Sequence, residues 1–143
     1  MPDGIEAIKE TKKGQTLTRF VSSEEANGLL PNRIVIPDDA ASNAKAVKYA
    51  VDDSISYSGV TMNREVVATL GLIPVQRTGV AIVEAGEAIP FNAPIKAGAN
   101  GRAFVAENTE LSIGLAEQEA AGEGDLIGVD LDLHNAGVEV GEG

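Results

Sequence analysis

Short runs of strand-forming residues, cut at close intervals by turn residues, constrain this 143-residue chain more than any other feature. The breaks carry Gly, Pro, Asn or Asp, and the runs between them are too short for an average helix. Several short strands at spacings of roughly 8–12 residues are typical of a sandwich or a small barrel. We predict strands over residues 33–36, 46–51, 54–57, 81–83, 93–96, 102–105, 112–116 and 126–133. The sequence therefore predicts a mainly β protein, a small β-barrel or β-sandwich.

Two segments carry local signals that refine this prediction. Asn100-Gly101 can take the positive φ angles of a type I′ turn, so we expect a hairpin between residues 94–97 and 102–106. Residues 63–70 are ambiguous, because Asn63 could cap a short helix while the β-branched residues that follow favour a strand. We lean towards the strand.

A weak internal repeat accompanies the strand pattern. The offset that aligns Tyr49 with Phe104 also aligns residues 52–54 with 107–109, and Gly59-Val60 with Gly114-Leu115. In each half an aromatic residue, an acidic or polar turn and a Gly-aliphatic pair follow one another. A structural duplication and a chance likeness both fit these positions, and a duplication would show as two similar strand-turn-strand units.

The charge of the chain is strongly acidic and uneven. Lys and Arg number 11 against 22 Asp and Glu, a formal net charge of −11, and residues 103–143 contain no Lys or Arg. Phosphate backbones and anionic membrane surfaces are bound through Lys and Arg, so we expect neither nucleic acid nor membrane as a partner. The sequence has neither an apolar stretch long enough to span a bilayer nor the features of a signal peptide. We expect synthesis in a cytoplasm.

Residues 1–44 differ from the rest in having few apolar pairs and a group of basic residues. We interpret them as an extended arm that needs a partner surface to become ordered, with a plain flexible terminus as the alternative. Residues 45–133 are then the barrel, and residues 134–143 a short acidic tail. The candidate contact residues of the arm are Lys9, Lys12, Lys13, Arg19 and Phe20. The alternative is that these lysines only keep an exposed terminus soluble.

The residues needed for catalysis are scarce. His134 is the only histidine and there is no cysteine, so one chain can build neither a His-based triad nor a multi-His metal site. Asp130 and Asp132 begin like a calcium loop, but an EF-hand needs Gly and Glu where Asn135 and Gly141 stand. Alternation with leucines instead favours a strand with one wet face. We expect no catalytic, cofactor-binding or metal-binding residues, and therefore no enzyme.

The second half of the chain carries a recognisable series of short motifs. Ala85-Gly86-Glu87-Ala88-Ile89 is followed by Gly101-Arg102-Ala103, Ile113-Gly114-Leu115-Ala116, and Gly124-Asp125-Leu126-Ile127-Gly128-Val129. This order of A-G-x-x-I, G-R-A, I-G-[LV]-A and G-D-x-I-x-V resembles the capsid decoration, or cement, proteins of tailed phages. The resemblance covers about residues 45–133. The residues before and after that range depart from the compact members of the family.

The resemblance implies a β-tulip-like barrel that binds the outside of a mature phage head, commonly as trimers. Its partners would be the major capsid protein, whose neighbouring subunits it locks together, and further copies of itself. No cofactor and no catalytic residue come with the family. One alternative is a trimeric β-fold nucleotide pyrophosphatase, which would need carboxylates for Mg²⁺ and basic residues for phosphate. A second is a carbohydrate-binding module displayed on the virion, which the 3% aromatic content does not favour.

Overall fold

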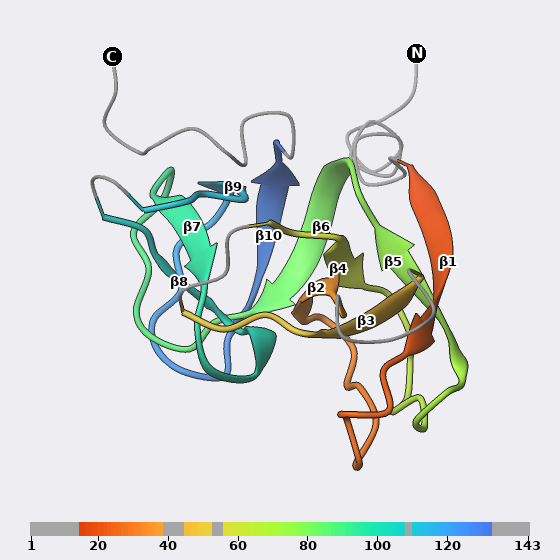
Figure 1. The fold of residues 1–143 in the computed structure, drawn as a ribbon. Helices are drawn as coiled ribbons and strands as arrows, with labels where there is room; N and C mark the ends of the chain where they lie inside the picture. Colours follow the sequence, from red (N-terminus) through yellow and green to blue (C-terminus); the bar gives the residue numbers. More distant parts are fainter. Residues whose placement is uncertain (1–14, 39–44, 53–55, 108–109, 133–143) are drawn as a thin grey trace.

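The computed structural model describes residues 15–38, 45–52, 56–107 and 110–132 of the chain. Within these ranges the chain forms strands and one short 3₁₀ turn, and no helix there is long and apolar enough to cross a membrane. The mainly β class predicted from the sequence is confirmed, with a barrel on one side of the molecule and a second sheet on the other (Figure 1). The elements are β1 (Thr16–Val21), β2 (Ile34–Pro37), β3 (Ala46–Tyr49), β4 (Gly59–Thr61), β5 (Leu72–Gln76), β6 (Gly79–Glu84), β7 (Pro94–Ala97), η1 (Ala99–Gly101), β8 (Ala103–Val105), β9 (Gly114–Ala116) and β10 (Leu126–Leu131).

The first five strands form a closed barrel in the order β1-β3-β2-β4-β5. Strand β1 closes it by pairing antiparallel with β5 and parallel with β3. Inside lies a small aliphatic core, fully buried, formed by Val21, Leu29, Val35, Val47, Ile73 and Val75. Alternate residues of short strands point inwards, so each strand contributes only one or two side chains to this core.

The last five strands form a second sheet in the order β6-β10-β9-β7-β8. Its core is rich in alanine and isoleucine and also includes four residues of the first unit, namely Ile34, Ala50, Tyr57 and Val60. Those four side chains lie on the outside of the barrel, because Val35, the neighbour of Ile34 in β2, belongs to the barrel core. The two units therefore share one hydrophobic junction.

The two units repeat one another in strand order and in register. Val60 pairs with Gln76 as Leu115 pairs with Asp130, so β4-β5 and β9-β10 match residue by residue. The other matching pairs, first unit before second, are Thr16–Gln76 with Val80–Asp130, Ile34–Val60 with Pro94–Leu115, Val35–Tyr49 with Ile95–Val105, the parallel Val21–Val47 with Ala85–Ala103, and Leu29–Val67 with Ile89–Ala120. This agreement identifies an internal duplication, as the weak sequence repeat suggested.

The sequence repeat was detectable because one glycine is required at the same place in both units. A Cβ at Gly59 would lie 2.2 Å from the carbonyl oxygen of Gln76, and one at Gly114 would lie 2.1 Å from that of Asp130. Neither position can carry a side chain without moving the neighbouring strand. The offset read from the sequence is right for β4 and β9, whereas β3 matches β8 one position further along, which pairs Tyr49 with Val105 instead of Phe104.

Seven of the eight predicted runs overlap an observed strand, and the exception is 54–57. Of that run, residues 54 and 55 lie outside the described residues, and Tyr57 is buried in the junction outside any strand. The hairpin at Asn100-Gly101 is confirmed between β7 and β8, although the loop is longer than a two-residue turn and includes η1. Residues 63–70 form neither helix nor strand, and only Val67 makes an isolated bridge to Leu29.

The structure places β1 and β2 inside the barrel, although both fall in the range that we interpreted as an extended arm. Strand β1 closes the barrel through its ladder with β5, and β2 lies between β3 and β4. The apolar pairs of this range looked too few for a core layer because their strand partners follow far along the chain. Residues 1–14, and the proposed acidic tail over 134–143, lie outside the described residues.

Candidate interaction surface

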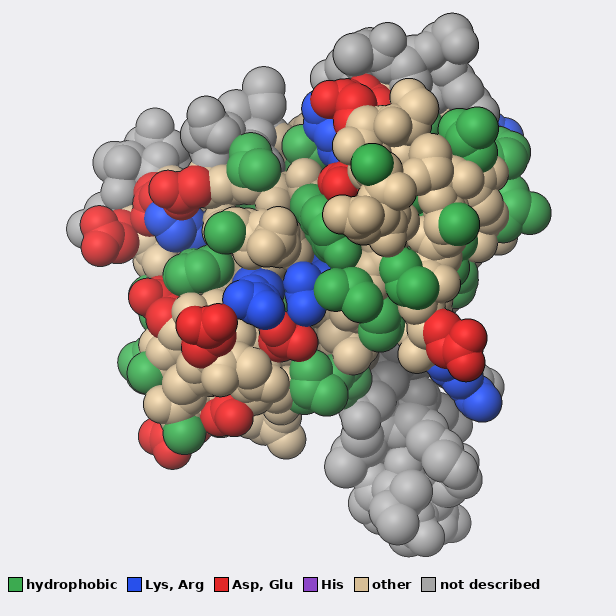
Figure 2. Space-filling view, turned by 90° about the horizontal axis from the view of Figure 1, so that it is seen from below, with side chains coloured by type: hydrophobic (Ala, Val, Ile, Leu, Met, Phe, Trp, Pro, Cys, Tyr) green, Lys and Arg blue, Asp and Glu red, His purple; other side chains and the backbone are tan. Residues whose placement is uncertain are grey.

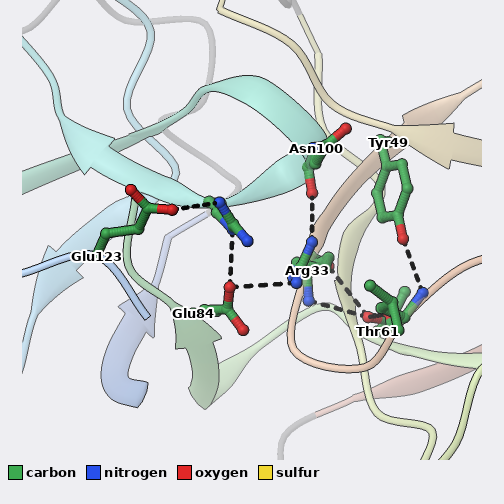
Figure 3. Close-up of polar contacts among 8 residues, drawn as sticks. Arg33, Tyr49, Thr61, Glu84, Asn100 and Glu123 are labelled. Carbon is green, nitrogen blue, oxygen red and sulfur yellow. Dashed lines mark hydrogen bonds and ion pairs between the residues drawn. The ribbon is translucent and has the colours of Figure 1, made fainter. Parts of the chain in front are cut away.

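A network of ion pairs joins the two units at their junction (Figure 3). Arg33, whose side chain is 7% exposed, donates from Nη2 to Glu84 Oε2 at 3.2 Å and from Nη1 to the Asn100 carbonyl at 3.2 Å. The same Glu84 oxygen lies 2.7 Å from Nε of Arg102, which also reaches Glu123 at 3.1 Å. The backbone N–H of Arg33 is held by the Thr61 hydroxyl. These cations neutralise carboxylates of their own chain, so their role is to fix the units against each other.

A second polar group ties the loop after β3 to the second sheet. Lys96 on β7 lies 2.7 Å from an Asp52 oxygen and 2.6 Å from a Glu110 oxygen. Hydrogen bonds to both carboxylates raise the pKa of Lys96 above its ordinary value, and the bond from Lys96 lowers the pKa of Glu110. Burial raises the pKa of the nearby Tyr57, partly opposed by a backbone hydrogen bond at Ala97 and the Lys96 charge. All these groups hold one protonation state near neutral pH, as expected of structural ion pairs.

Charge is divided very unequally between the two units. In the first unit the described residues up to 78 contain six Lys and Arg against five Asp and Glu, a balance of +1. In the second unit, the described residues from 79 onwards contain two against ten, a balance of −8. Figure 2 shows carboxylates spread over the lobe of the second unit, with Lys and Arg side chains gathered where the lobes meet. No group of three or more His, Cys, Asp and Glu within the described ranges could hold a metal ion.

The structure separates the candidate contact residues predicted from the sequence. Lys9, Lys12 and Lys13 lie outside the described residues. Arg19 and Phe20 are adjacent on β1, so their side chains point to opposite faces of the sheet. Phe20 is on the outer face, paired with Leu72 of β5, whereas Arg19 follows the inward alternation of Val21. The two residues therefore cannot serve one contact surface together.

Phe20 belongs to an uncharged outer face of the barrel. In β1 it shares this face with Thr16 and Thr18, and Thr18 pairs with Pro74. The N–H of Met62, just after β4, donates to the Pro74 carbonyl at 3.0 Å, and Thr16 Oγ1 lies 3.6 Å from Met62 Sδ. We call this surface the neutral face; its members are Thr16, Thr18, Phe20, Met62, Leu72 and Pro74. Large apolar side chains on it reach solvent, with Leu72 60% exposed and Met62 42%.

Sequence reasoning missed both the junction network and most of the neutral face. Arg33 is far from both Glu84 and Asn100 along the chain, so no local pattern joins them. Strand β5 was missed because Pro74 interrupts its strand-like run, although a proline is tolerated where its missing N–H faces no partner. One signal was present, since β5 matches the correctly predicted β10 in the internal repeat.

The fold and its comparison with known proteins define a class. The chain is a duplicated, all-β protein whose described surface offers contact faces and structural ion pairs. No family model matches its sequence, and no curated protein matches it. Among solved structures, it is similar to the head fiber gp8.5 N base of bacteriophage phi29, with a TM-score of 0.64 and 17% sequence identity. The match covers 82% of this chain and 95% of that one. This likeness shows a shared fold.

Proposed function

We propose that this chain is a structural, non-catalytic component of a phage head. The observation that carries the proposal is the shared fold, which extends over 95% of the head fiber base and 82% of this chain. The motif series in the second half of the chain supports the same setting from the sequence. A rigid double unit with few aromatic residues and internally paired charges suits a protein that binds other proteins.

In more detail, the chain binds the outer surface of the capsid, contacts the major capsid protein, and holds neighbouring subunits together as a trimer. The acidic second unit then faces solvent, away from packaged DNA, because its balance of −8 would be repelled by phosphates. Many copies on one shell make weak individual contacts collectively strong. The basic residues Lys9, Lys12 and Lys13 are proposed to contact acidic capsid surface, since the cations at the junction are already paired.

The test uses capsids assembled from the major capsid protein of the phage that encodes the chain. Purified chain should co-sediment with them, appear in electron cryomicroscopy as density on the outer surface, and raise the temperature at which the shells open. Failure to bind mature shells would refute the proposal. Binding with no gain in shell stability would refute the cementing role and leave a head-attached protein, such as a fiber base.

The basic segment is tested separately by substitution. Deleting residues 1–20 is unsuitable, because β1 begins at Thr16 and closes the barrel. Replacing Lys12 and Lys13 by Gln should weaken capsid binding and reduce its salt dependence. The matched control is Arg64→Gln with Arg77→Gln, which removes the same charge elsewhere. Equal effects of the two double variants would show that only net charge matters and would refute the contact.

A further inference from the structure

Electrostatics limits where two copies of this chain can meet. The chain carries a net charge of −11, and the described part of its second unit contributes −8. Two acidic surfaces brought together lose free energy through repulsion and through desolvation of their carboxylates. A contact between copies is therefore favoured where carboxylates are absent and apolar side chains are exposed.

The neutral face meets both conditions. Its six members come from β1, β5 and the residue after β4, and none of them is charged. Phe20 and Leu72 lie directly opposite each other across the ladder, as do Thr18 and Pro74. Leu70, 67% exposed, comes shortly before Leu72 at the same end of the strand. Aromatic, methionine and leucine side chains on an antiparallel sheet form the kind of surface that a second sheet covers.

The duplication supplies an internal comparison for this surface. By the register of the two units, the second-unit counterparts of Phe20, Leu72 and Met62 are Glu84, Leu126 and Glu117. Asp130 is exposed beside them, at the position that Gln76 holds in the first unit. The counterpart face thus keeps one exposed leucine, Leu126 at 55%, but surrounds it with carboxylates. The same fold presents an apolar face in one unit and a charged one in the other.

We infer that the neutral face is the surface through which copies of this chain contact one another. This inference rests on the proposed function in so far as that function involves a trimer, and it gives the residues that would form the contact between copies. The partner is a second copy of the chain, because this surface avoids repulsion between two molecules that each carry a net charge of −11. Packing of Phe20, Leu72 and Met62 between copies removes apolar surface from water.

The test is the oligomeric state of the full chain, measured by sedimentation equilibrium and native mass spectrometry over a range of concentrations. Leu72→Glu should raise the dissociation constant between copies by about a hundredfold, because each contact would then bury an unpaired carboxylate. Leu126→Glu is the matched control. It introduces the same charge at the corresponding exposed position of the second unit and should change the constant by less than about threefold.

Three outcomes would overturn the inference. One is a wild-type chain that stays monomeric at high micromolar concentration, and another is an equal effect of the two substitutions. The third is a Leu72→Glu chain that still associates but no longer binds capsids, which would assign the neutral face to the capsid protein. Both leucines are exposed, so circular dichroism should show both variants folded. Capsid binding by wild-type monomer would leave the proposed function standing while removing this inference.

Discussion

Truncation of Val60 to alanine should destabilise the protein more than truncation of Leu115, although leucine loses the larger group. The two residues occupy the same register position in the two units. Val60 is 1% exposed because the second unit covers it, next to Ile34 in the junction, whereas Leu115 is 45% exposed. Two buried carbon atoms at about 0.8 kcal/mol each, with a cavity between the units, give a loss of roughly 2–3 kcal/mol for Val60→Ala. Leu115→Ala leaves no closed cavity and should cost about 1 kcal/mol or less.

Urea denaturation followed by far-ultraviolet circular dichroism is the appropriate assay, since the chain has no tryptophan. Val60→Ala should lower the midpoint without changing the slope if the junction makes the two units unfold together. A loss for Leu115→Ala equal to or greater than that for Val60→Ala would refute the reasoning. A second transition in the wild-type curve would show that the units unfold separately and that the junction contributes little.

Three further substitutions test the contacts described above. Arg33→Met should lower the free energy of unfolding by about 2 kcal/mol in urea titrations, because it removes charged hydrogen bonds across the junction. Lys96→Met should cost about 0.5–1 kcal/mol at pH 7. The pKa of Glu110 is lowered in the folded state, so this difference should shrink as pH falls below 4.5, which thermal unfolding between pH 7 and 3 would show. Gly114→Ala should cost about 1–3 kcal/mol through its clash with the neighbouring strand, while Gly122→Ala, with open space around it, should be nearly neutral in the same assay.

The strand pattern was predictable wherever it depended on local residues. Runs such as 81–83 and 126–133 contain β-branched and aliphatic residues between turn residues, and both overlap observed strands. The hairpin at Asn100-Gly101 was predictable for the same reason, since Asn100 adopts φ of 60° and Gly101 φ of 70°. Local conformational preference and the final structure agree at these places.

Prediction failed where strand formation depends on partners that are distant in the sequence. Strand β1 is a mixed polar stretch, and its ladder joins Thr16 to Gln76, which lies beyond three intervening strands of the chain. Residues 63–70 have strand-like composition but stay a loop, because only Val67 finds a partner. A short strand is stable through its neighbours, so its composition alone does not decide it.

The candidate site divides in the same way. Phe20 was singled out from the sequence and does lie half-buried on an outer face, whereas its neighbour Arg19 is directed to the other side of the strand. Leu72 and Met62 could not be recognised as its companions, because the ladder between β1 and β5 and the contact after β4 bring them together.

The sequence by itself determined that this chain is a β protein with a small-residue core, an acidic second half and an internal repeat anchored by Gly59 and Gly114. Those properties follow from residue type and short-range spacing. Only the tertiary structure decided that residues 16–21 close a barrel, that Arg33 and Glu84 join two units, and that one unit exposes a neutral face where the other exposes carboxylates. Register and burial depend on which distant strands pair, and local propensity carries no information about that choice.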